Sequence, residues 1–300
     1  MPSFPSPERW TTRAQPWLGT LVEIALPPAE ASAARFACAF SAIAHVHRKM
    51  SAHDPASDLA RIARDAHWRP VVVDPDTFAV LELAQDLYRE SDGAFDLAIA
   101  PLLARSGQLP AGAAGSATDC ATMTALRLER GFSVRATVPV ALDLSGIAKG
   151  HAVDRAIDAL RAAGARTGMV NAGGDLRVFG AGTWLPIRVR HPASPALTRA
   201  IFDIRNAAVA TSADYFRATQ LVDPRTRSLR PFRDSITVVA PTCALADALT
   251  KIVALRPAES VAVLARHRAH AFVLGDDGAH CVTTCAESTA HLRLPVPIAP

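Results

Sequence analysis

Hydrophobic and polar residues follow two different periods in the first third of the chain. Residues 19–26, GTLVEIAL, alternate between the two types, which is typical of a strand with one buried face. Large side chains then recur at helical spacing and predict an amphipathic helix, at Phe36, Phe40, Ile43, His47 and Met50. A second helix is predicted between the Asp-Pro pair at 74–75 and Gly93, after a short strand at 71–73. Its inward side chains are expected to be Val80, Leu83 and Leu87.

The rest of the chain continues this mixture without strict strand–helix–strand order. We expect a loop over residues 103–122, two strands over 131–144, and helices over 147–163, 243–255 and 258–267. GMVNAGGDLRVFG predicts a β-hairpin, and further strands are expected at 185–189, 200–204, 235–239, 269–275 and 280–285. The chain is therefore predicted to be a single α+β domain with mixed or antiparallel sheets and flanking helices.

Composition narrows the possible functions. Half of the 300 residues are apolar, which supports a sizeable core, and the net charge is only +4. No run of Lys or Arg concentrates that charge, so we expect no nucleic-acid partner, whereas a small anion such as a nucleotide suits it. The odd number of cysteines, five, fits a reducing compartment.

The amino-terminal residues carry prolines and charges where a signal peptide needs an apolar core. No uninterrupted apolar run approaches the length of a membrane span. A cytoplasmic protein is the expectation, although a misassigned start would hide an export signal.

The segment 142–154, LDLSGIAKGHAVD, places Lys149 between two glycines at the start of a predicted helix. The free N–H groups and positive dipole end of such a helix, together with an ammonium, suit a phosphate. The alternative is that Gly146 and Gly150 only permit a tight turn and close packing while Lys149 lies in water. No Walker loop or Gly-x-Gly-x-x-Gly motif is present.

Two further segments carry candidate chemistry. In NAGGDL, residues 171–176, the glycines would let the backbone approach a flat ligand and Asp175 hydrogen-bond it, although a plain hairpin turn explains the same letters. In TCALADALTK, Asp247 shares a helix face with Thr250 and Lys251. Asp247 either pairs with Lys251 or, if buried beside a hydroxyl, suits a hard cation such as Mg²⁺.

Eight segments resemble, in sequence and in order, the FAD:protein FMN transferase (ApbE) family: WLGTLVEI, MSAHDPASDLARI, SDGAFDLAIAPLL, LDLSGIAKGHAVD, GMVNAGGDL, AVATSADYFR, LVDPRTR and ITVVAPTCALADALTK. The resemblance runs over residues 13–255, and we expect a flexible lead at 1–12 and one domain at 13–292. It implies a compact, T-fold-like α+β fold that binds FAD and Mg²⁺. The implied reaction cleaves FAD, attaches FMN through a phosphoester to a Thr or Ser of a target flavoprotein, and releases AMP.

The resemblance also implies roles for particular residues. Those expected at the cofactor are Leu18, His53, Ala94, Phe95, Asp96, Asp143, Lys149, Asn171 and Asp175. The expected metal ligands are the main chain of Gly146 and the side chains of Asp247 and Thr250. Asp247, Lys149 and Gln220 are the expected catalytic residues.

Five positions depart from the family pattern. Leu18 stands where a Met often lies near the flavin and His53 where a Tyr usually packs on it, and the other three bear on the chemistry. Lys251 stands where a Thr usually binds the metal, Gln220 replaces a His thought to assist transfer, and the glycine that usually ends the DPxTG turn is Arg227. Glutamine cannot act as a base. Two alternatives therefore stay open: an FAD-binding protein without transfer activity, and an FAD pyrophosphatase in which water replaces the target hydroxyl.

Overall fold

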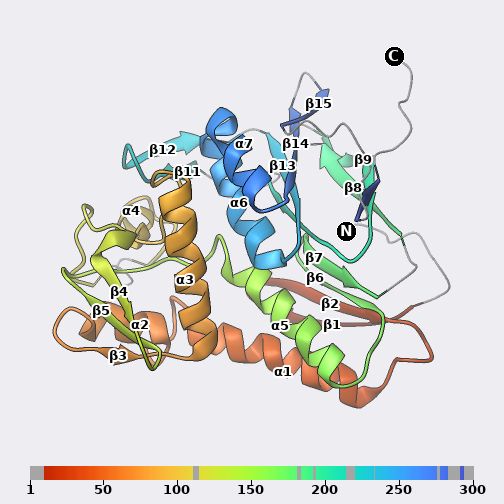
Figure 1. The fold of residues 1–300 in the computed structure, drawn as a ribbon, viewed down its shortest axis with the longest axis horizontal. Helices are drawn as coiled ribbons and strands as arrows, with labels where there is room; N and C mark the ends of the chain where they lie inside the picture. The colour runs from red at the N-terminus through yellow and green to blue at the C-terminus, as the bar shows by residue number, and fades with distance from the viewer. Residues whose placement is uncertain are drawn as a thin grey trace. The chain divides into compact units, whose positions relative to one another are not determined.

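A computed structural model describes residues 10–110, 115–180, 184–191, 194–213, 220–232, 234–275, 278–282 and 291–293 (Figure 1). The chain forms two compact units. Unit 1 is made of residues 1–44, 149–219 and 232–300, and unit 2 of residues 45–148 and 220–231. Among the described residues, no helix combines the length and the apolar character needed to cross a bilayer.

Unit 1 is built on an eight-stranded antiparallel sheet. Its strands, in spatial order, are β1 (Thr11–Trp17), β2 (Thr20–Leu26), β6 (Gly168–Ala172), β7 (Asp175–Phe179), β10 (Ala208–Ser212), β13 (Ser235–Ala240), β14 (His270–Gly275) and β15 (Gly278–Cys281). A second antiparallel sheet contains β8 (Leu185–His191), β9 (Ser194–Ile204) and β16 (Leu292–Arg293).

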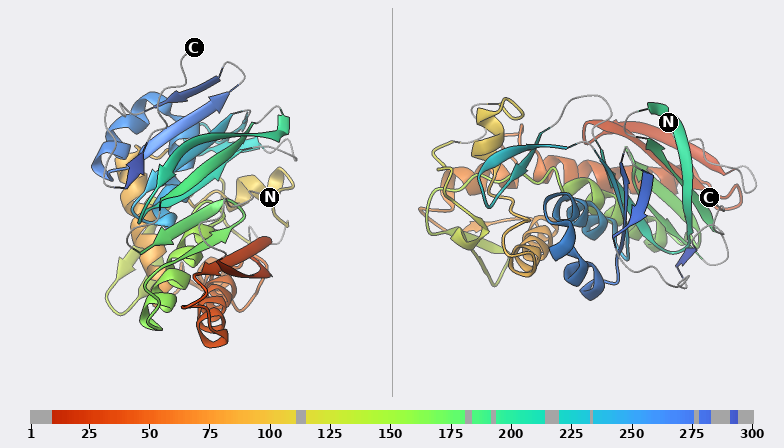
Figure 2. Two further views of the ribbon diagram at one scale, coloured as in Figure 1. Left: turned by 90° about the vertical axis from the view of Figure 1, so that its right-hand side faces the viewer. Right: turned by 90° about the horizontal axis from the view of Figure 1, so that it is seen from above.

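Four helices belong wholly or partly to unit 1: α1 (Ala33–Met50), α5 (Ala148–Ala162), α6 (Cys243–Leu255) and α7 (Pro257–Arg266). Helix α6 packs on β7, β10 and β13. The opposite face of the sheet contributes Val178, Val209 and Val239 to an apolar cluster with side chains of β8 and β9. Figure 2 shows α6 and the β8–β9 ribbon on opposite sides of the large sheet. Central strand β13 is therefore buried along its whole length.

Unit 2 contains helices α2 (Asp58–Asp65), α3 (Pro75–Glu90) and α4 (Ala100–Arg105), and the 3₁₀ turn η2 (Met123–Ala125). Its sheet has the order β3 (Val71–Val72), β5 (Ser133–Ala136), β4 (Leu126–Glu129). The hairpin of β11 (Gln220–Asp223) and β12 (Ser228–Pro231) returns to this unit from far along the chain. Arg225 anchors it, because Nε donates to the carbonyl of Asp92 at 2.6 Å and Nη2 to that of Ser91 at 3.0 Å.

The α+β class with antiparallel sheets is confirmed, as are α1, α5, α6 and the β6–β7 hairpin. Several details differ from the expectations. Only β5 forms within 131–144, and its partner β4 lies before it. Helix α4 begins before, and extends into, the expected loop, and on α3 Leu81 and Ala84 are buried where Leu83 was expected.

The expected amino-terminal lead overlaps β1, which begins at Thr11, while residues 1–9 lie outside the described part. Strand β15 covers the start of the strand expected at 280–285, and residues 283–285 are likewise outside it. The single-domain organisation over 13–292 stays a prediction beside the two units.

Candidate functional site

A cluster of opposite charges in unit 1 joins three segments that are far apart in the sequence. Lys149 Nζ in the first turn of α5 lies 2.6 Å from Asp175 Oδ2, at the start of β7, and 3.3 Å from Asp247 Oδ2, on α6. Both aspartates are almost fully buried, whereas 31% of the Lys149 side chain is exposed. We call Lys149, Asp175, Asp247 and Lys251 the lysine–aspartate cluster.

Close packing of the starts of α5 and α6 positions this cluster. A Cβ added at Gly150 would lie 2.2 Å from the carbonyl oxygen of Cys243, so only glycine allows the approach. Asp154, one turn later on α5, accepts hydrogen bonds from the amides of Cys243 and Ala244, both at 2.9 Å, and so caps α6. Gly150 thus does permit close packing, but Lys149 is paired with acids and does not lie free in water.

The second ammonium of the cluster contacts four oxygen atoms. Lys251 Nζ lies 2.7 Å from Ser212 Oγ, 2.9 Å from Thr250 Oγ1, 3.1 Å from Asp247 Oδ1 and 3.4 Å from the Asp247 carbonyl. The Thr250 hydroxyl donates to that same carbonyl at 2.6 Å. Asp247 is therefore paired with Lys251, as the first interpretation of the sequence expected. It is also buried beside the Thr250 hydroxyl, as the second expected.

Burial and charge act in opposite directions on these groups. Burial lowers the pKa of Lys149, but the charges of Asp175 and Asp247 outweigh it and raise that pKa above its ordinary value. Burial and the neighbouring charge of Asp247 raise the pKa of Asp175. Burial also raises the pKa of Asp247, but the two lysines outweigh this and lower it. The cluster thus holds Lys149 as an ammonium.

The expected Mg²⁺ does not fit this arrangement of Asp247 and Thr250. Mg²⁺ takes its oxygen ligands at about 2.0–2.1 Å in octahedral geometry. Here Oδ1 of Asp247 and Oγ1 of Thr250 accept from Lys251, and Oδ2 of Asp247 faces Lys149 and the Gly150 amide at 3.4 Å. A dication 4 Å from one ammonium is repelled by roughly 8 kcal/mol at an effective dielectric constant of about 20.

Two other residues expected at the cofactor lie at turns of the large sheet. Asn171, at the end of β6, donates to Glu23 Oε2 at 3.1 Å and accepts from the amide of Gly174 at 2.9 Å, so it shapes the hairpin turn that precedes Asp175. Leu18 lies between β1 and β2 with a φ of 55°, a left-handed conformation uncommon outside glycine.

In unit 2, the segment containing Ala94, Phe95 and Asp96 is buried after the end of α3. Oδ1 of Asp96 accepts from the amides of Ala98 at 2.8 Å and Met123 at 3.2 Å. Burial raises the pKa of Asp96 to about 6, although those amides and the charge of Arg227 oppose the shift. This carboxyl group therefore titrates close to neutral pH.

Asp143 and Gly146 lie just before α5. Asp143 Oδ2 accepts from the Ser145 hydroxyl at 2.5 Å, and its amide donates to the Leu97 carbonyl at 2.8 Å, which ties it to the Asp96 segment. Gly146 lies in a turn in which the amides of residues 147 and 148 donate to the carbonyl of Leu144.

His53 lines a cavity of about 570 Å³ within unit 2. Leu59, Arg64 and Leu142 line other parts of it. A cavity of this size with apolar and charged walls is typical of a small-molecule site.

The β11–β12 hairpin contains both Gln220 and Arg227. Gln220 begins β11 opposite Pro231, and its side chain lies outside the described part. Arg227 adopts the left-handed conformation, φ 56°, at the position where the family pattern has glycine. Its Nη2 donates to the Ala121 carbonyl at 2.8 Å. The turn thus carries an arginine side chain near Asp96 where the family's glycine has none.

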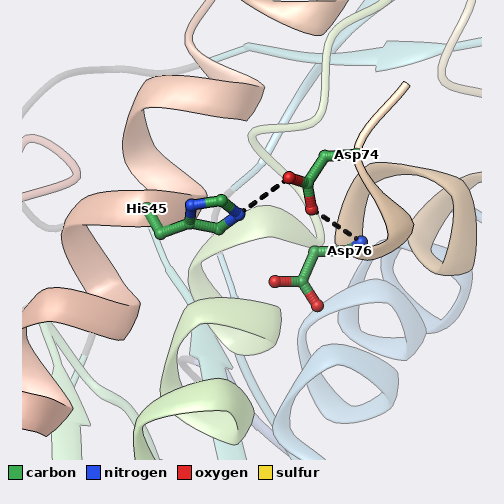
Figure 3. A group of neighbouring side chains, drawn as sticks. All are labelled: His45, Asp74 and Asp76. Atoms are coloured by element: carbon green, nitrogen blue, oxygen red, sulfur yellow. Dashed lines mark hydrogen bonds and ion pairs between the residues drawn. The ribbon is translucent and has the colours of Figure 1, made fainter. Parts of the chain in front are cut away.

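A histidine and two aspartates elsewhere in unit 2 also approach one another (Figure 3). His45, Asp74 and Asp76 bring one potential ligand atom each within 4.8 Å. Asp74, however, caps α3 through the amide of Asp76 at 3.0 Å and accepts from His45 Nε2 at 2.9 Å, with Lys49 Nζ 3.9 Å away. Helix capping and ion pairing account for this group without a metal.

Comparison with known proteins identifies the family. The ApbE family matches residues 18–274, most of the chain. This chain is a member of the ApbE family. It is 31% identical over 255 residues to an FAD:protein FMN transferase of Rhodobacter capsulatus, covering 77% of this chain and 48% of that protein. It is 28% identical over 234 residues to one of Haemophilus influenzae, covering 68% of this chain and 67% of that protein. The chain thus spans about half the length of the Rhodobacter relative.

Solved ApbE structures have the same fold. The flavin transferase ApbE of Vibrio cholerae superposes with a TM-score of 0.77 at 25% identity, over 92% of this chain and 97% of that one. The ApbE protein of Thermotoga maritima gives a TM-score of 0.77 at 25% identity, over 91% and 97%.

The ApbE motifs meet within each unit. Unit 1 brings together Lys149, Asp175, Asp247 and Thr250, and unit 2 brings together Asp96 and Asp143. Sequence reasoning missed Ser212, because it ends a strand, β10, that shows no clear alternation. It also missed the contact of Arg227 with the Asp96 region, for which the DPRTR turn gives no signal.

Proposed function

We propose that this ApbE protein is an FAD:protein FMN transferase. The observation that carries the proposal is the lysine–aspartate cluster, in which Lys149 from DLSGIAKG, Asp175 from NAGGD and Asp247 from CALADALTK converge. Two relatives that align over most of this chain's length are named FAD:protein FMN transferase.

The proposed reaction is a phosphoryl-type transfer at the FMN phosphorus of FAD. The hydroxyl oxygen of a Thr or Ser in the target flavoprotein forms a bond to that phosphorus, and the bond from phosphorus to the bridging oxygen breaks. The bridging oxygen leaves with AMP and the bonding electron pair, and the hydroxyl proton passes to solvent or to a base. Charge accumulates on the leaving phosphate, so positive groups beside it accelerate the step.

Among the residues of the cluster, Lys149 is best placed to stabilise the negative charge on the leaving phosphate. Two of its three N–H groups face Asp175 and Asp247 among the described contacts, which leaves one to donate to a phosphate oxygen. Asp175 and Asp247 keep the ammonium charged and fixed. Within unit 2, His53 and the Asp96 segment stay proposed as cofactor-contacting residues.

Gln220 has no ring nitrogen to accept the target's hydroxyl proton. The transfer is therefore expected to be slow unless the target or water takes that proton. The target flavoprotein and the cellular location stay predictions from the sequence. Magnesium dependence is not part of the proposal, because the Lys251 ammonium contacts two of the expected ligands, Asp247 and Thr250.

The test incubates the purified protein with FAD and a flavin-carrier domain, with and without Mg²⁺. Fluorescent carrier in a denaturing gel, with one AMP released per label, supports transfer. AMP with free FMN and no label identifies a pyrophosphatase, and tightly bound intact FAD identifies a binding protein. Lys149→Met should abolish labelling, whereas Lys49→Met, at a half-exposed lysine of α1, should leave it unchanged. Full labelling by Lys149→Met would remove Lys149 from the site.

A further inference from the structure

Lysine is rare in this chain, and its distribution is uneven. The sequence contains three lysines, Lys49, Lys149 and Lys251, against an abundance of arginine. Two of the three contact the same buried carboxylate, that of Asp247. A protein that otherwise relies on arginine thus uses two of its three ammonium groups at this one carboxylate.

The surroundings of Lys251 Nζ are those of a small cation. Its contacts are two hydroxyls, a carboxylate oxygen and a main-chain carbonyl, at 2.7–3.4 Å. Hydroxyl, carboxylate and carbonyl oxygens are also the ligands of hard metal ions, but at shorter distances. A planar guanidinium could not donate to oxygens disposed around a single point, whereas an ammonium with three rotatable donors can.

Charge balance is already complete without a metal. Lys149 and Lys251 supply two positive charges, and Asp175 and Asp247 supply two negative ones. Asp247 faces one ammonium with each of its carboxylate oxygens. A divalent ion at Asp247 would have to displace one of these ammonium groups from its carboxylate oxygen, and one bound by Asp247 Oδ1 and Thr250 would displace Lys251.

We propose that the Lys251 ammonium is a built-in cation that takes the place of a divalent metal at Asp247. The chain then binds FAD without Mg²⁺, and Lys251 excludes metal from Asp247, Thr250 and Ser212. This inference deepens the proposed function and rests on it for the identity of the nucleotide. The exclusion of metal itself depends only on the lysine–aspartate cluster.

The experiment measures metal binding and FAD binding separately. Mn²⁺, which shares the preference of Mg²⁺ for oxygen ligands, is titrated into the metal-free protein and followed by electron paramagnetic resonance. FAD affinity is measured by flavin fluorescence in Mg²⁺ and in chelator. The proteins are the wild type, Lys251→Thr, which replaces the ammonium by a hydroxyl, and Lys49→Met as the control.

The wild type and Lys49→Met should bind no Mn²⁺ through Asp247, and their FAD affinity should change less than about twofold between Mg²⁺ and chelator. Lys251→Thr should gain one Mn²⁺ site that Asp247→Asn removes, and Mg²⁺ should tighten its FAD binding by about 5- to 150-fold. Stoichiometric Mn²⁺ on the wild type that Asp247→Asn abolishes would overturn the inference. That arm decides even if Lys251→Thr does not fold.

Failure of the proposed function gives a different result. A wild type that binds no FAD in either condition would contradict the nucleotide assignment. The Mn²⁺ titrations of the wild type and Lys251→Thr would still decide whether Lys251 excludes a metal.

Discussion

Among single residues, Asp96 gives the clearest pH dependence. Its pKa is raised by burial from 3.8 to about 6, so the native state keeps a proton that the unfolded chain releases between those values. Below pH 4 the wild type and Asp96→Asn should therefore have similar free energies of unfolding. As the pH rises to 6, the wild type should lose stability relative to the variant. By pH 7.5 the variant should be more stable by roughly 3 kcal/mol. Urea unfolding of both proteins at pH 4 and pH 7.5 measures this difference, and an equal gap at both pH values would contradict it.

The charge of Lys149 matters for folding as well as for the proposed chemistry. Lys149→Met leaves two buried carboxylates, Asp175 and Asp247, with a single ammonium, that of Lys251, to balance their charge. Breaking such a buried pair costs about 3–5 kcal/mol. The matched variant Lys49→Met removes a half-exposed ion pair at 3.9 Å and should cost less than about 1 kcal/mol. Chemical denaturation at pH 7 compares the two, and equal losses would mean that Lys149 is not held as the cluster indicates.

Residue chemistry could be predicted where an unusual side chain stood in a regular pattern. Lys149 between two glycines and Asp247 on an apolar helix were both recognisable. Their mutual contact was not, because no local rule places α5 beside α6. Ser212, which completes the oxygen shell of Lys251, lies 39 positions before it and gives no signal of its own.

At the level of elements, Asp154 joins α5 to α6. Its carboxylate accepts hydrogen bonds from two amides at the start of α6, and another from Arg177 Nη1 at 2.6 Å. Asp154→Ala removes a charged helix cap and a largely buried ion pair together, and should cost about 3–5 kcal/mol of unfolding free energy. Asp158→Ala, on the same helix, removes an exposed pair with Arg155 and should cost less than about 1 kcal/mol. Thermal and urea unfolding provide the measurement, and a small loss in Asp154→Ala would show that α6 does not depend on this cap.

The elements predicted correctly are those with a strong period or a clear boundary. The bounds of helix α6 were predicted residue for residue, and the structure adds that Thr242 caps it. Strand β10, with the letters AVATS, is short and made of small residues, so neither period is visible. Helix α4 was missed because Pro101 and six residues give too little pattern.

At the scale of the whole molecule, chain order conceals the two units. Unit 2 consists mostly of residues 45–148, but it also includes the β11–β12 hairpin of residues 220–231. The hairpin is fixed to that unit by Arg225 and Arg227, which donate to carbonyls more than a hundred positions earlier. Periodicity reports only local structure, so this return could not be read from the sequence.

The two units should also differ in how readily their strands open. All six residues of β13 are buried, and the strand is hydrogen-bonded to β10 on one side and β14 on the other. All four residues of β12 are exposed, and it pairs with β11. An amide of β13 exchanges only when α6 and the apolar cluster both leave the sheet, whereas β12 opens by local fraying. Hydrogen exchange should therefore be about a thousandfold slower or more in β13 than in β12. Mass spectrometry of peptides covering the two strands measures the ratio, and comparable protection would mean that β12 is covered in solution.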